Sequence, residues 1–321
     1  MTAAPATANE APDPCADAVK VQRGIDAPLR ALLLDAFGLD IADPVPVHGG
    51  EEAATWKVTA DGAAWIVRIS PTWRTVAELE WVYDVVGHVA RVVPEVPMPR
   101  RTRHSTWTVT IDGHTVTVHP FVAGSRLDWL DSLQREAAAT LLARVHRAFE
   151  AWPGRRERPG GQPLRPVDFV TDPSALADLD LDRWLEDLPR FGLACDLIHR
   201  DVYPRNLLWR DSRIAALVDW DELAVDWREQ EVAWTIWEFC QDEAGTDLDL
   251  PAAARLLAAY EQAGGVVAPG FAALAASCIR RRLRIECVVA LVARAAGRPF
   301  DAHYLAAGLA AFANLRNAVV G

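Results

Sequence analysis

Two carboxylates and one side-chain amide are the residues of this chain best suited to catalysis. Asp201 and Asn206 lie five residues apart in a polar stretch, and Asp219 follows thirteen residues after Asn206. A carboxylate beside a hydroxyl group can accept its proton, and an amide oxygen with a second carboxylate can hold Mg²⁺. Phosphoryl transfer needs positioning and charge neutralisation more than covalent chemistry, so this set of residues indicates a phosphotransferase.

Short apolar runs must position these residues. They occupy residues 197–198, 207–209 and 217–218, and polar segments separate them. The pattern predicts a strand, a polar loop, a second strand, a turn at residues 211–213 and a third strand. A hairpin of this kind brings the polar residues at its ends together, so the two carboxylates and the amide are expected to form one site.

The motif formed by these residues resembles that of the aminoglycoside phosphotransferase and choline kinase branch of the kinase-like fold. That family typically shows His-Gly-Asp, an Asn five residues later and then Ile-Asp-Trp or Ile-Asp-Phe. This chain has His-Arg-Asp at residues 199–201, then Asn206, then Val-Asp-Trp at residues 218–220. It departs from the family at Arg200, where glycine is usual, and from protein kinases at Asp221, which replaces the glycine of Asp-Phe-Gly. A loop whose Asp and Asn merely cap turns stays an alternative.

The resemblance implies a role for each residue of the motif. Asp201 would orient and deprotonate the hydroxyl of an acceptor, while Asn206 and Asp219 would hold Mg²⁺. His199 would brace the loop, as its counterpart does in kinases. His146, in a Leu-Ala-x-x-His pattern that the family shares, is expected to be a packed core histidine. The phosphate donor would be a nucleoside triphosphate, with ATP favoured and GTP left open.

Arg68 is expected to bind phosphate. It lies within the apolar strand predicted for residues 64–69, where a cation needs a reason, and its guanidinium fork matches phosphate oxygens. An arginine that extends to water from an edge strand is the alternative. In the resembling family a helical glutamate supports this residue. Glu80 fits the Glu-x-x-aliphatic pattern of the family, but Glu78 and a solvated helix face stay open.

Two further segments are expected to meet the nucleotide. Gly49 and Gly50 precede a predicted strand pair and could form a loop over phosphates, although two glycines are more often a plain turn. The resemblance places a hinge between two lobes just after His119, where backbone groups of Phe121 and Val122 would meet adenine. His119 itself is expected to be a hinge residue rather than a catalyst.

The rest of the sequence predicts an α+β fold. Strands are expected at residues 51–59, 64–69, 107–111 and 115–118, with hairpin turns at Asp61-Gly62 and Asp112-Gly113. Helices are expected at residues 27–37, 75–89, 136–149, 174–188, 230–240, 251–263, 269–295 and 302–319. With the resemblance, this order implies a two-lobed protein-kinase-like fold: a small antiparallel-sheet N-lobe at residues 24–119, a hinge at 120–124 and a mainly helical C-lobe at 125–321.

Bulk composition argues against several classes of protein. The net charge of −11 disfavours nucleic acid as a partner, and no apolar run reaches the roughly 18 residues of a membrane helix. Residues 1–23 lack the regions of a signal peptide and predict a disordered tail, which favours the cytoplasm. The five cysteines are odd in number and form no Cys-x-x-Cys pair, which predicts reduced thiols. We expect a monomer or a weak homodimer.

The acceptor is expected to carry positive charge. Between Asp219 and Asp249 the chain has eleven acidic residues and one basic residue, Arg228. In the resembling family this segment borders the acceptor cleft, and its field would attract a polyamine or aminocyclitol. The acids expected to face the acceptor are Asp221, Glu222, Glu238 and Asp242.

Other assignments of the acceptor stay open. The acidic segment could instead face solvent, and the arginines at 280–282 and 284 could neutralise it or meet an anionic acceptor. The first hypothesis is therefore an enzyme that phosphorylates an aminoglycoside or related antibiotic and confers resistance. A metabolic kinase for choline, homoserine or a sugar is the second, and a nucleotide-binding pseudokinase is the third. The intact catalytic motif argues against the third.

Overall fold

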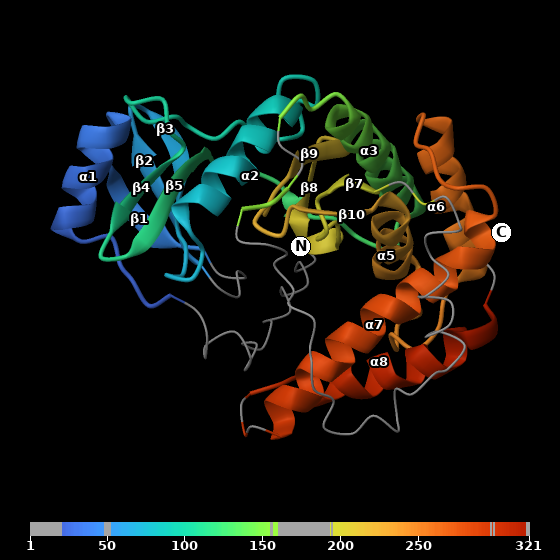
Figure 1. The fold of residues 1–321 in the computed structure, drawn as a ribbon. Coiled ribbons are helices and arrows are strands. Elements are labelled where there is room, and N and C mark those ends of the chain that lie inside the picture. The colour runs from blue at the N-terminus through green and yellow to red at the C-terminus, as the bar shows by residue number, and fades with distance from the viewer. Residues whose placement is uncertain are drawn as a thin grey trace, which may run out of the picture.

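A five-stranded sheet forms the first part of the molecule, and helices with two smaller sheets form the rest (Figure 1). The structure, a computed structural model, describes residues 21–47, 53–154, 157–159, 193, 195–295, 297 and 299–318. Most of the predicted tail, the Gly49-Gly50 pair and the helix predicted at 174–188 lie outside these residues. Within them, the predicted order of an antiparallel sheet followed by a mainly helical part is confirmed.

The first sheet is antiparallel throughout, with the strand order β1-β2-β3-β5-β4. Its strands are β1 (Ala42–Pro46), β2 (Ala54–Ala60), β3 (Ala63–Ile69), β4 (Thr108–Ile111) and β5 (His114–Pro120). Both predicted Asp-Gly turns form, and all four turn residues have the positive φ that two-residue hairpins need: Asp61, Gly62, Asp112 and Gly113. Strand β3 pairs on both sides, so Arg68 does not extend from an edge strand.

Helix α1 (Ala27–Phe37) completes a small core with this sheet. Asp26 caps its first turn by accepting from the Leu29 amide at 3.0 Å, and Gly38 ends it at φ 69°. The buried residues of this core come from the helix and from three strands: Leu29, Leu33, Phe37, Val58, Val67, Ile69, Val116 and Val118. The sheet that carries Arg68 is thus stabilised on one face without help from the rest of the chain.

Helix α2 (Val76–Val89) connects the sheet to the rest of the chain, as Figure 1 shows. Thr75 and Glu78 form a capping box at its first turn. Its buried residues join the core of the larger, helical part rather than the core under α1. The lobe boundaries at 24–119, 120–124 and 125–321 stay our proposal, and α2 belongs by its packing to the larger core.

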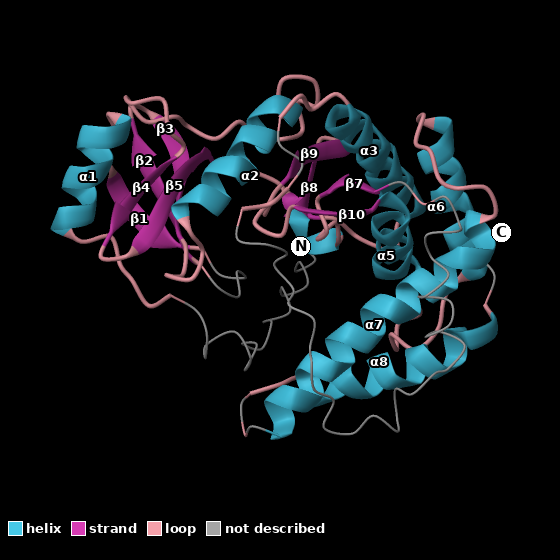
Figure 2. Cartoon of the chain, viewed as in Figure 1, coloured by secondary structure: helices cyan, strands magenta, loops and turns pink. Residues whose placement is uncertain are grey.

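The helical part contains ten helices and strands within the described residues, apart from two short 3₁₀ turns. They are β6 (Ser125–Arg126), α3 (Ser132–Glu150), β7 (Cys195–Ile198), β8 (Leu207–Arg210), β9 (Arg213–Leu217), β10 (Ala224–Trp227), α5 (Arg228–Cys240), α6 (Leu250–Gln262), α7 (Phe271–Ala295) and α8 (Ala302–Asn314). Strands β6, β8 and β9 form one sheet, and β7 pairs with β10. Helices α7 and α8 lie side by side at the far end from the first sheet (Figure 2).

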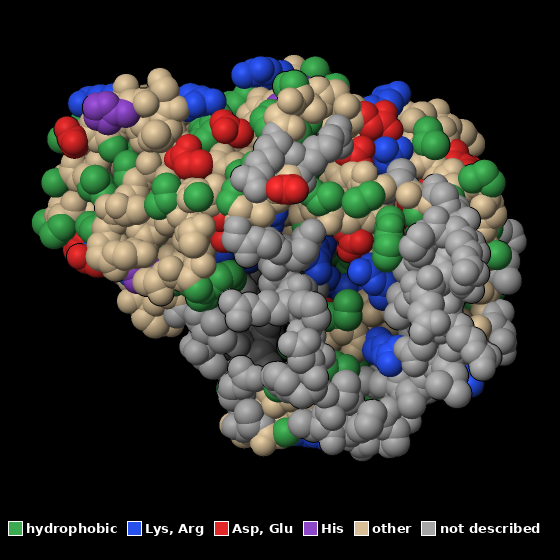
Figure 3. Space-filling view, in the orientation of Figure 1, with side chains coloured by type: hydrophobic (Ala, Val, Ile, Leu, Met, Phe, Trp, Pro, Cys, Tyr) green, Lys and Arg blue, Asp and Glu red, His purple; other side chains and the backbone are tan. Residues whose placement is uncertain are grey.

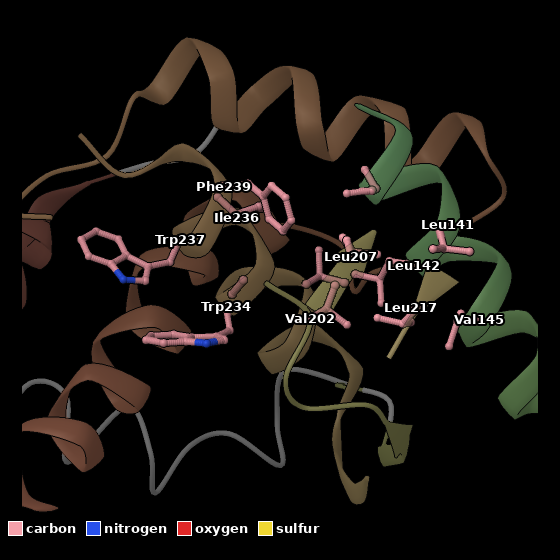
Figure 4. Close-up of a cluster of buried hydrophobic side chains, with 14 of the residues drawn as sticks. Leu141, Leu142, Val145, Val202, Leu207, Leu217, Trp234, Ile236, Trp237 and Phe239 are labelled. Carbon is pink, nitrogen blue, oxygen red and sulfur yellow. The ribbon is translucent and has the colours of Figure 1, made fainter. Parts of the chain in front are cut away.

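Apolar side chains anchor the polar loop predicted from the sequence. Val202, Leu207 and Leu217 lie in one buried cluster with residues of α3 and α5, including Leu142 and Phe239 (Figure 4). The predicted succession of strand, loop, strand, turn and strand is confirmed in β7, β8 and β9. Because these anchors are buried, the ends of the loop are fixed while its polar residues face the space between the two parts.

Two expectations about the rest of the chain can be checked. The cysteines that the structure describes are all free thiols: Cys195, Cys240, Cys278 and Cys287. Across the described ranges, none of the helices is both long and apolar enough to cross a membrane.

The last predicted helix is shorter than expected, because α8 ends at Asn314 and a 3₁₀ turn follows.

Candidate active site

A buried glutamate holds the backbone of the loop after β7. The carboxylate of Glu231, on α5, accepts hydrogen bonds from the amides of His199 at 3.2 Å and of Arg200. Its Oε2 also lies 2.7 Å from Nε2 of His146, whose Nδ1 lies 2.7 Å from the hydroxyl of Tyr260. His146 is therefore the packed core histidine that the sequence predicted. Because Glu231 is only 3 % exposed, the loop is held from inside the protein.

Two residues of the site have a left-handed backbone. Arg200 has φ 73° and Asp219 has φ 61°, values that are uncommon for residues other than glycine. Such conformations cost on the order of 1–3 kcal/mol each and persist where the surroundings hold them. Glu231 holds the amide of Arg200, and an arginine from β3 holds the side chain of Asp219.

Asn206 joins the two carboxylates predicted to carry the chemistry. Its Nδ2 donates to Oδ2 of Asp201 at 2.8 Å and to the carbonyl of Asp201 at 3.0 Å. Its own carbonyl accepts from the Val218 amide at 2.9 Å, which brings Asp219 beside it. Burial raises the pKa of Asp201 to about 7, and the charges of Asp219 and Glu222 act in the same direction. The three predicted residues therefore meet, and no residue that the structure describes bonds to the amide oxygen of Asn206.

His199 braces this arrangement. Its side chain is fully buried, and its ring packs against that of Trp220 with the centroids 4.4 Å apart. Its Nδ1 accepts a hydrogen bond from the Asp201 amide at 3.2 Å. Burial lowers the pKa of His199, which keeps the imidazole neutral. The side chain is thus placed to orient the backbone of Asp201 and not to exchange protons with an acceptor.

Arg68 reaches from the sheet to the segment that follows β9. One of its terminal nitrogens lies 2.9 Å from Asp219 and 2.8 Å from Asp221. The hydroxyl of Tyr83, on α2, donates to the other carboxylate oxygen of Asp221 at 3.1 Å. The predicted phosphate-binding arginine therefore lies directly against the predicted metal ligand Asp219.

The predicted pairing of Arg68 with Glu80 is wrong. Glu80 accepts hydrogen bonds from the amide of Trp107, at 3.0 and 3.1 Å, and from the amide and hydroxyl of Thr108 at 2.8 and 2.6 Å. It thereby ties α2 to the start of β4. Glu78, the other candidate, instead bonds to Arg74 at 3.0 Å. The reason is geometric, since residues two apart on a helix point about 200° apart and each finds a different neighbour.

A cavity of about 320 Å³ lies between the two parts of the molecule. Six residues predicted to bind nucleotide or metal line it: Arg68, His119, Phe121, Val122, Asn206 and Asp219. The Phe121 amide already donates to the Ala64 carbonyl at 3.1 Å, so it is not free for a base. Burial lowers the pKa of His119 to about 4, with the charge of Arg68 acting in the same direction. His119 is thus neutral, in keeping with its predicted non-catalytic role.

A second cavity, of about 450 Å³, adjoins the first. Arg126, Tyr203 and Arg205 line both, so the two cavities meet at the catalytic loop. Acidic and aromatic side chains dominate the rest of the lining: Trp129, Trp237, Glu238, Asp242, Glu243, Asp301 and Tyr304. This mixture suits an amine, because carboxylates pair with ammonium groups and aromatic faces attract cations.

Glu238 is the acid in this cavity with the most unusual surroundings. It makes no ion pair or hydrogen bond with any residue that the structure describes. Burial raises its pKa to about 8, and the charges of Asp201 and Glu286 act in the same direction. An unpaired, partly buried carboxylate is costly to a fold and is typical of a ligand site.

Two of the acids predicted to face the acceptor do not. Asp221 is 3 % exposed, and its oxygens are bonded to Arg68 and Tyr83. Glu222 is paired with the buried Arg74. Both carboxylates neutralise arginines at the junction of the two parts. The prediction that they face the acceptor is therefore wrong, and their roles are structural. Their charges were included in the count of acids between residues 219 and 249, but the sequence could not show that Arg68 and Arg74 already neutralise them.

Asp242 lines the acceptor cavity but is also engaged. Its carboxylate accepts from the Thr246 amide at 2.6 Å and the Asp247 amide at 3.1 Å, which lowers its pKa. Of the four predicted acids, Glu238 alone therefore lies in the cavity with both oxygens unbonded within the described chain. That α8 adds Tyr304 to this lining could not be predicted, because the helix is far away along the chain.

We expect Glu80→Ala to lower the free energy of unfolding by about 1–3 kcal/mol, because it leaves the amides of Trp107 and Thr108 without their acceptor. Nucleotide affinity should not change. Chemical denaturation and calorimetric titration with an ATP analogue measure the two effects. Glu80→Gln, which keeps one acceptor oxygen, should lose less stability. A large loss of nucleotide affinity with intact stability would restore the pairing with Arg68.

Glu238→Gln should stabilise the empty protein at alkaline pH. A carboxylate whose pKa is raised from 4.5 to about 8 by folding loses stability as pH rises through that window, and the amide does not. Melting temperatures at pH 5 and pH 9 test this expectation. The difference between the variant and the parent should grow toward pH 9, and Glu243→Gln on the exposed rim is the control. A variant less stable than the parent at pH 9 would contradict the unpaired state of Glu238.

Comparison with known proteins agrees with this geometry. The family model described as the phosphotransferase enzyme family matches residues 43–276. A homoserine kinase of Zymomonas mobilis is 22 % identical over 209 residues, which are 60 % of this chain and 64 % of that relative. Among solved structures, an amicoumacin kinase bound to AMP-PNP and Ca²⁺ aligns with a TM-score of 0.65 at 12 % identity, over 85 % of this chain and 89 % of the other.

A microcompartment-associated aminopropanol kinase aligns with a TM-score of 0.63 at 17 % identity, over 90 % of this chain and 95 % of the other. At these identities the structural matches establish the fold, which is that of kinase-like phosphotransferases, as predicted. The chain spans about two thirds of the length of the Zymomonas relative. Since the family model covers most of the chain, including the loop at 199–206 and Asp219, this protein belongs to the phosphotransferase enzyme family.

Proposed function

We propose that this enzyme transfers the γ-phosphate of ATP to a hydroxyl group of a small, amine-bearing acceptor. The observation that carries the proposal is the position of Asp201. It is bonded to Asn206, which lines the first cavity beside Asp219, and it lies two residues before Tyr203, which lines both cavities. A base between a phosphate donor and an acceptor is the arrangement that phosphoryl transfer needs.

The first cavity suits a nucleotide. The amicoumacin kinase with this fold binds AMP-PNP and Ca²⁺, which supports ATP as the donor. Hard oxygen ligands fit Mg²⁺, and the unbonded amide oxygen of Asn206 with the carboxylate of Asp219 would hold it. When bound, Mg²⁺ supplies positive charge that neutralises the phosphates. In the empty enzyme one guanidinium group, that of Arg68, pairs with both Asp219 and Asp221. With the metal on Asp219, Arg68 would bond to a phosphate oxygen in place of Asp219.

The chemical step follows from this placement. The acceptor oxygen forms a bond to the γ-phosphorus, while the bond between that phosphorus and the bridging oxygen of the leaving ADP breaks. The proton of the hydroxyl passes to a carboxylate oxygen of Asp201. A pKa near 7 suits this task, because the carboxylate is then a stronger base than an ordinary aspartate and about half of it is ionised in neutral solution.

Two classes of acceptor fit the acidic cavity. The first is an aminoglycoside or another antibiotic amine, as the sequence predicted, and the cavity of about 450 Å³ has room for a ring with amino groups. The second is a small hydroxy amino acid in metabolism. The sequence relatives favour this class, because those found are homoserine kinases from several bacteria. The unpaired Glu238 would bind the ammonium group in either class.

Asp201→Asn tests the proposed base. The variant keeps the size of the side chain but loses its basicity, so kcat should fall by about 10²–10⁴-fold while the affinity for Mg²⁺ and AMP-PNP changes little. Release of ADP in the presence of a screen of hydroxyl-bearing amines measures kcat, and calorimetry measures the affinity. Asp211→Asn, in the exposed turn between β8 and β9, is the matched control and should behave as the parent. Near-normal kcat in Asp201→Asn would remove Asp201 from the role of base.

A further inference from the structure

Three arginine side chains surround a small cavity behind the catalytic loop. Arg200 comes from the loop itself, and Arg281 and Arg282 come from α7. The cavity measures about 20 Å³, which is room for an oxygen atom or two. Its other lining residues are Ile198, Asp226, Gln230, Glu231, Trp234 and Ile285. Figure 3 shows Lys and Arg side chains gathered on this face over the region of α5 and α7, with a few acids beside them. We call this hollow the arginine cavity.

The three arginines differ in how far they are paired. Arg281 bonds to Asp226 at 3.3 Å and to Gln230 at 2.9 Å. Arg282 pairs with Glu286 at 2.7 Å, but its Nε is buried and has no partner among the described residues. The guanidinium of Arg200 makes no ion pair or hydrogen bond with any part of the chain that the structure describes, although it is largely removed from water. Of the three guanidinium groups, that of Arg200 is therefore the one without a carboxylate partner within the described residues.

Aromatic rings hold the side chains of two of the three arginines in place. The guanidinium of Arg281 lies over the ring of Trp227 at 4.9 Å, and that of Arg282 lies over Trp234 at 5.4 Å. Stacking on aromatic rings restricts the rotamers of long side chains, so less entropy is lost when a ligand binds. The backbone of Arg200 is fixed by Glu231. Two stacked guanidinium groups beside the unpaired guanidinium of Arg200 suit an anion.

The arginine cavity lies close to the acceptor cavity, because Arg282 lines the first and the next residue of α7, Leu283, lines the second. The charge of Arg282 acts on Arg200 at one cavity and on Glu238 and Tyr304 at the other. An acceptor whose hydroxyl is at Asp201 and whose ammonium is at Glu238 has its remaining substituent near this arginine.

The geometry points to a carboxylate of the acceptor as the anion bound by Arg200 and Arg282. This inference rests on the proposed function and narrows it, because the acceptor is then a hydroxy amino acid and not a polyamine. A cavity of about 20 Å³ admits the oxygens of a planar carboxylate more readily than a tetrahedral phosphate. The ammonium group pairs with Glu238, so one acceptor satisfies the unpaired acid and the unpaired arginine together.

The residue at position 200 departs from the pattern that its motif resembles. In the family that its catalytic motif resembles, a glycine without a side chain is usual here. The φ of 73° is a conformation that glycine adopts without strain, so the backbone alone does not require arginine. The side chain costs conformational energy and brings an unpaired charge, and binding an anion accounts for both.

Three matched pairs of acceptors test the inference. L-serine and ethanolamine, L-homoserine and 3-amino-1-propanol, and L-threonine and 1-amino-2-propanol differ only by the carboxylate. With ATP and Mg²⁺, the release of ADP gives kcat/KM for each, and calorimetry with Mg²⁺ and AMP-PNP present gives binding without turnover. We expect at least one amino acid to exceed its amino alcohol by about tenfold to a hundredfold, the strength of a charge-assisted pair.

Arg200→Gly should bring that ratio close to one, chiefly by raising KM for the amino acid, and its melting temperature shows whether the fold is kept. Arg294→Gln is the control and should keep the ratio. Arg294 is exposed and lies near the end of α7, the helix that carries Arg282. Equal or better turnover of the amino alcohols, or of the polyamine kanamycin, would overturn the inference and leave the proposed function intact. Failure of every amino acid to bind would also overturn it. If the enzyme in addition turned over no acceptor, the proposed function would fail with it.

Discussion

Buried ion pairs at the junction of the two parts determine where the catalytic groups lie. Arg68 bonds to Asp219 and Asp221, and Arg74, which is 2 % exposed, bonds to Glu78 and to the carbonyl of Asp221. A charge removed from water is costly unless a partner neutralises it, so each of these residues stabilises the others. The segment after β9 is therefore not a free surface loop. It is fixed by side chains from β3 and α2, and Asp219 is placed with it.

A second buried carboxylate performs the same task for the catalytic loop. Glu231 binds two backbone amides of the loop and His146, while apolar anchors such as Leu207 fix its ends. The charges used for positioning are thus internally compensated. By contrast, Glu238 and Arg200 face cavities and have no charged partner within the described chain. The fold separates charges that hold its own structure from charges that are left for a ligand.

Local patterns in the sequence were enough to predict much of this arrangement. The Asp-Gly turns, the strand order around the catalytic loop and the meeting of Asp201 with Asn206 depend on neighbours close in the chain. It was harder to predict from the sequence which side chains bond to each other. Glu80 was assigned to Arg68 and Asp221 to the acceptor, but Glu80 is bonded to Thr108 and Asp221 to Arg68. A count of acids between 219 and 249 gave the sign of the field and not the subset that faces the acceptor.

We propose that Arg68 and Asp219 mark the phosphate and metal positions. A crystal structure of the enzyme with AMP-PNP and Mg²⁺ would test this placement. We expect Mg²⁺ about 2.0–2.1 Å from a carboxylate oxygen of Asp219 and from the amide oxygen of Asn206, with Arg68 bonded to a phosphate. The Arg68–Asp219 pair, 2.9 Å long in the empty enzyme, would then be broken. A nucleotide bound in the cavity with this pair intact and the metal elsewhere would contradict the account.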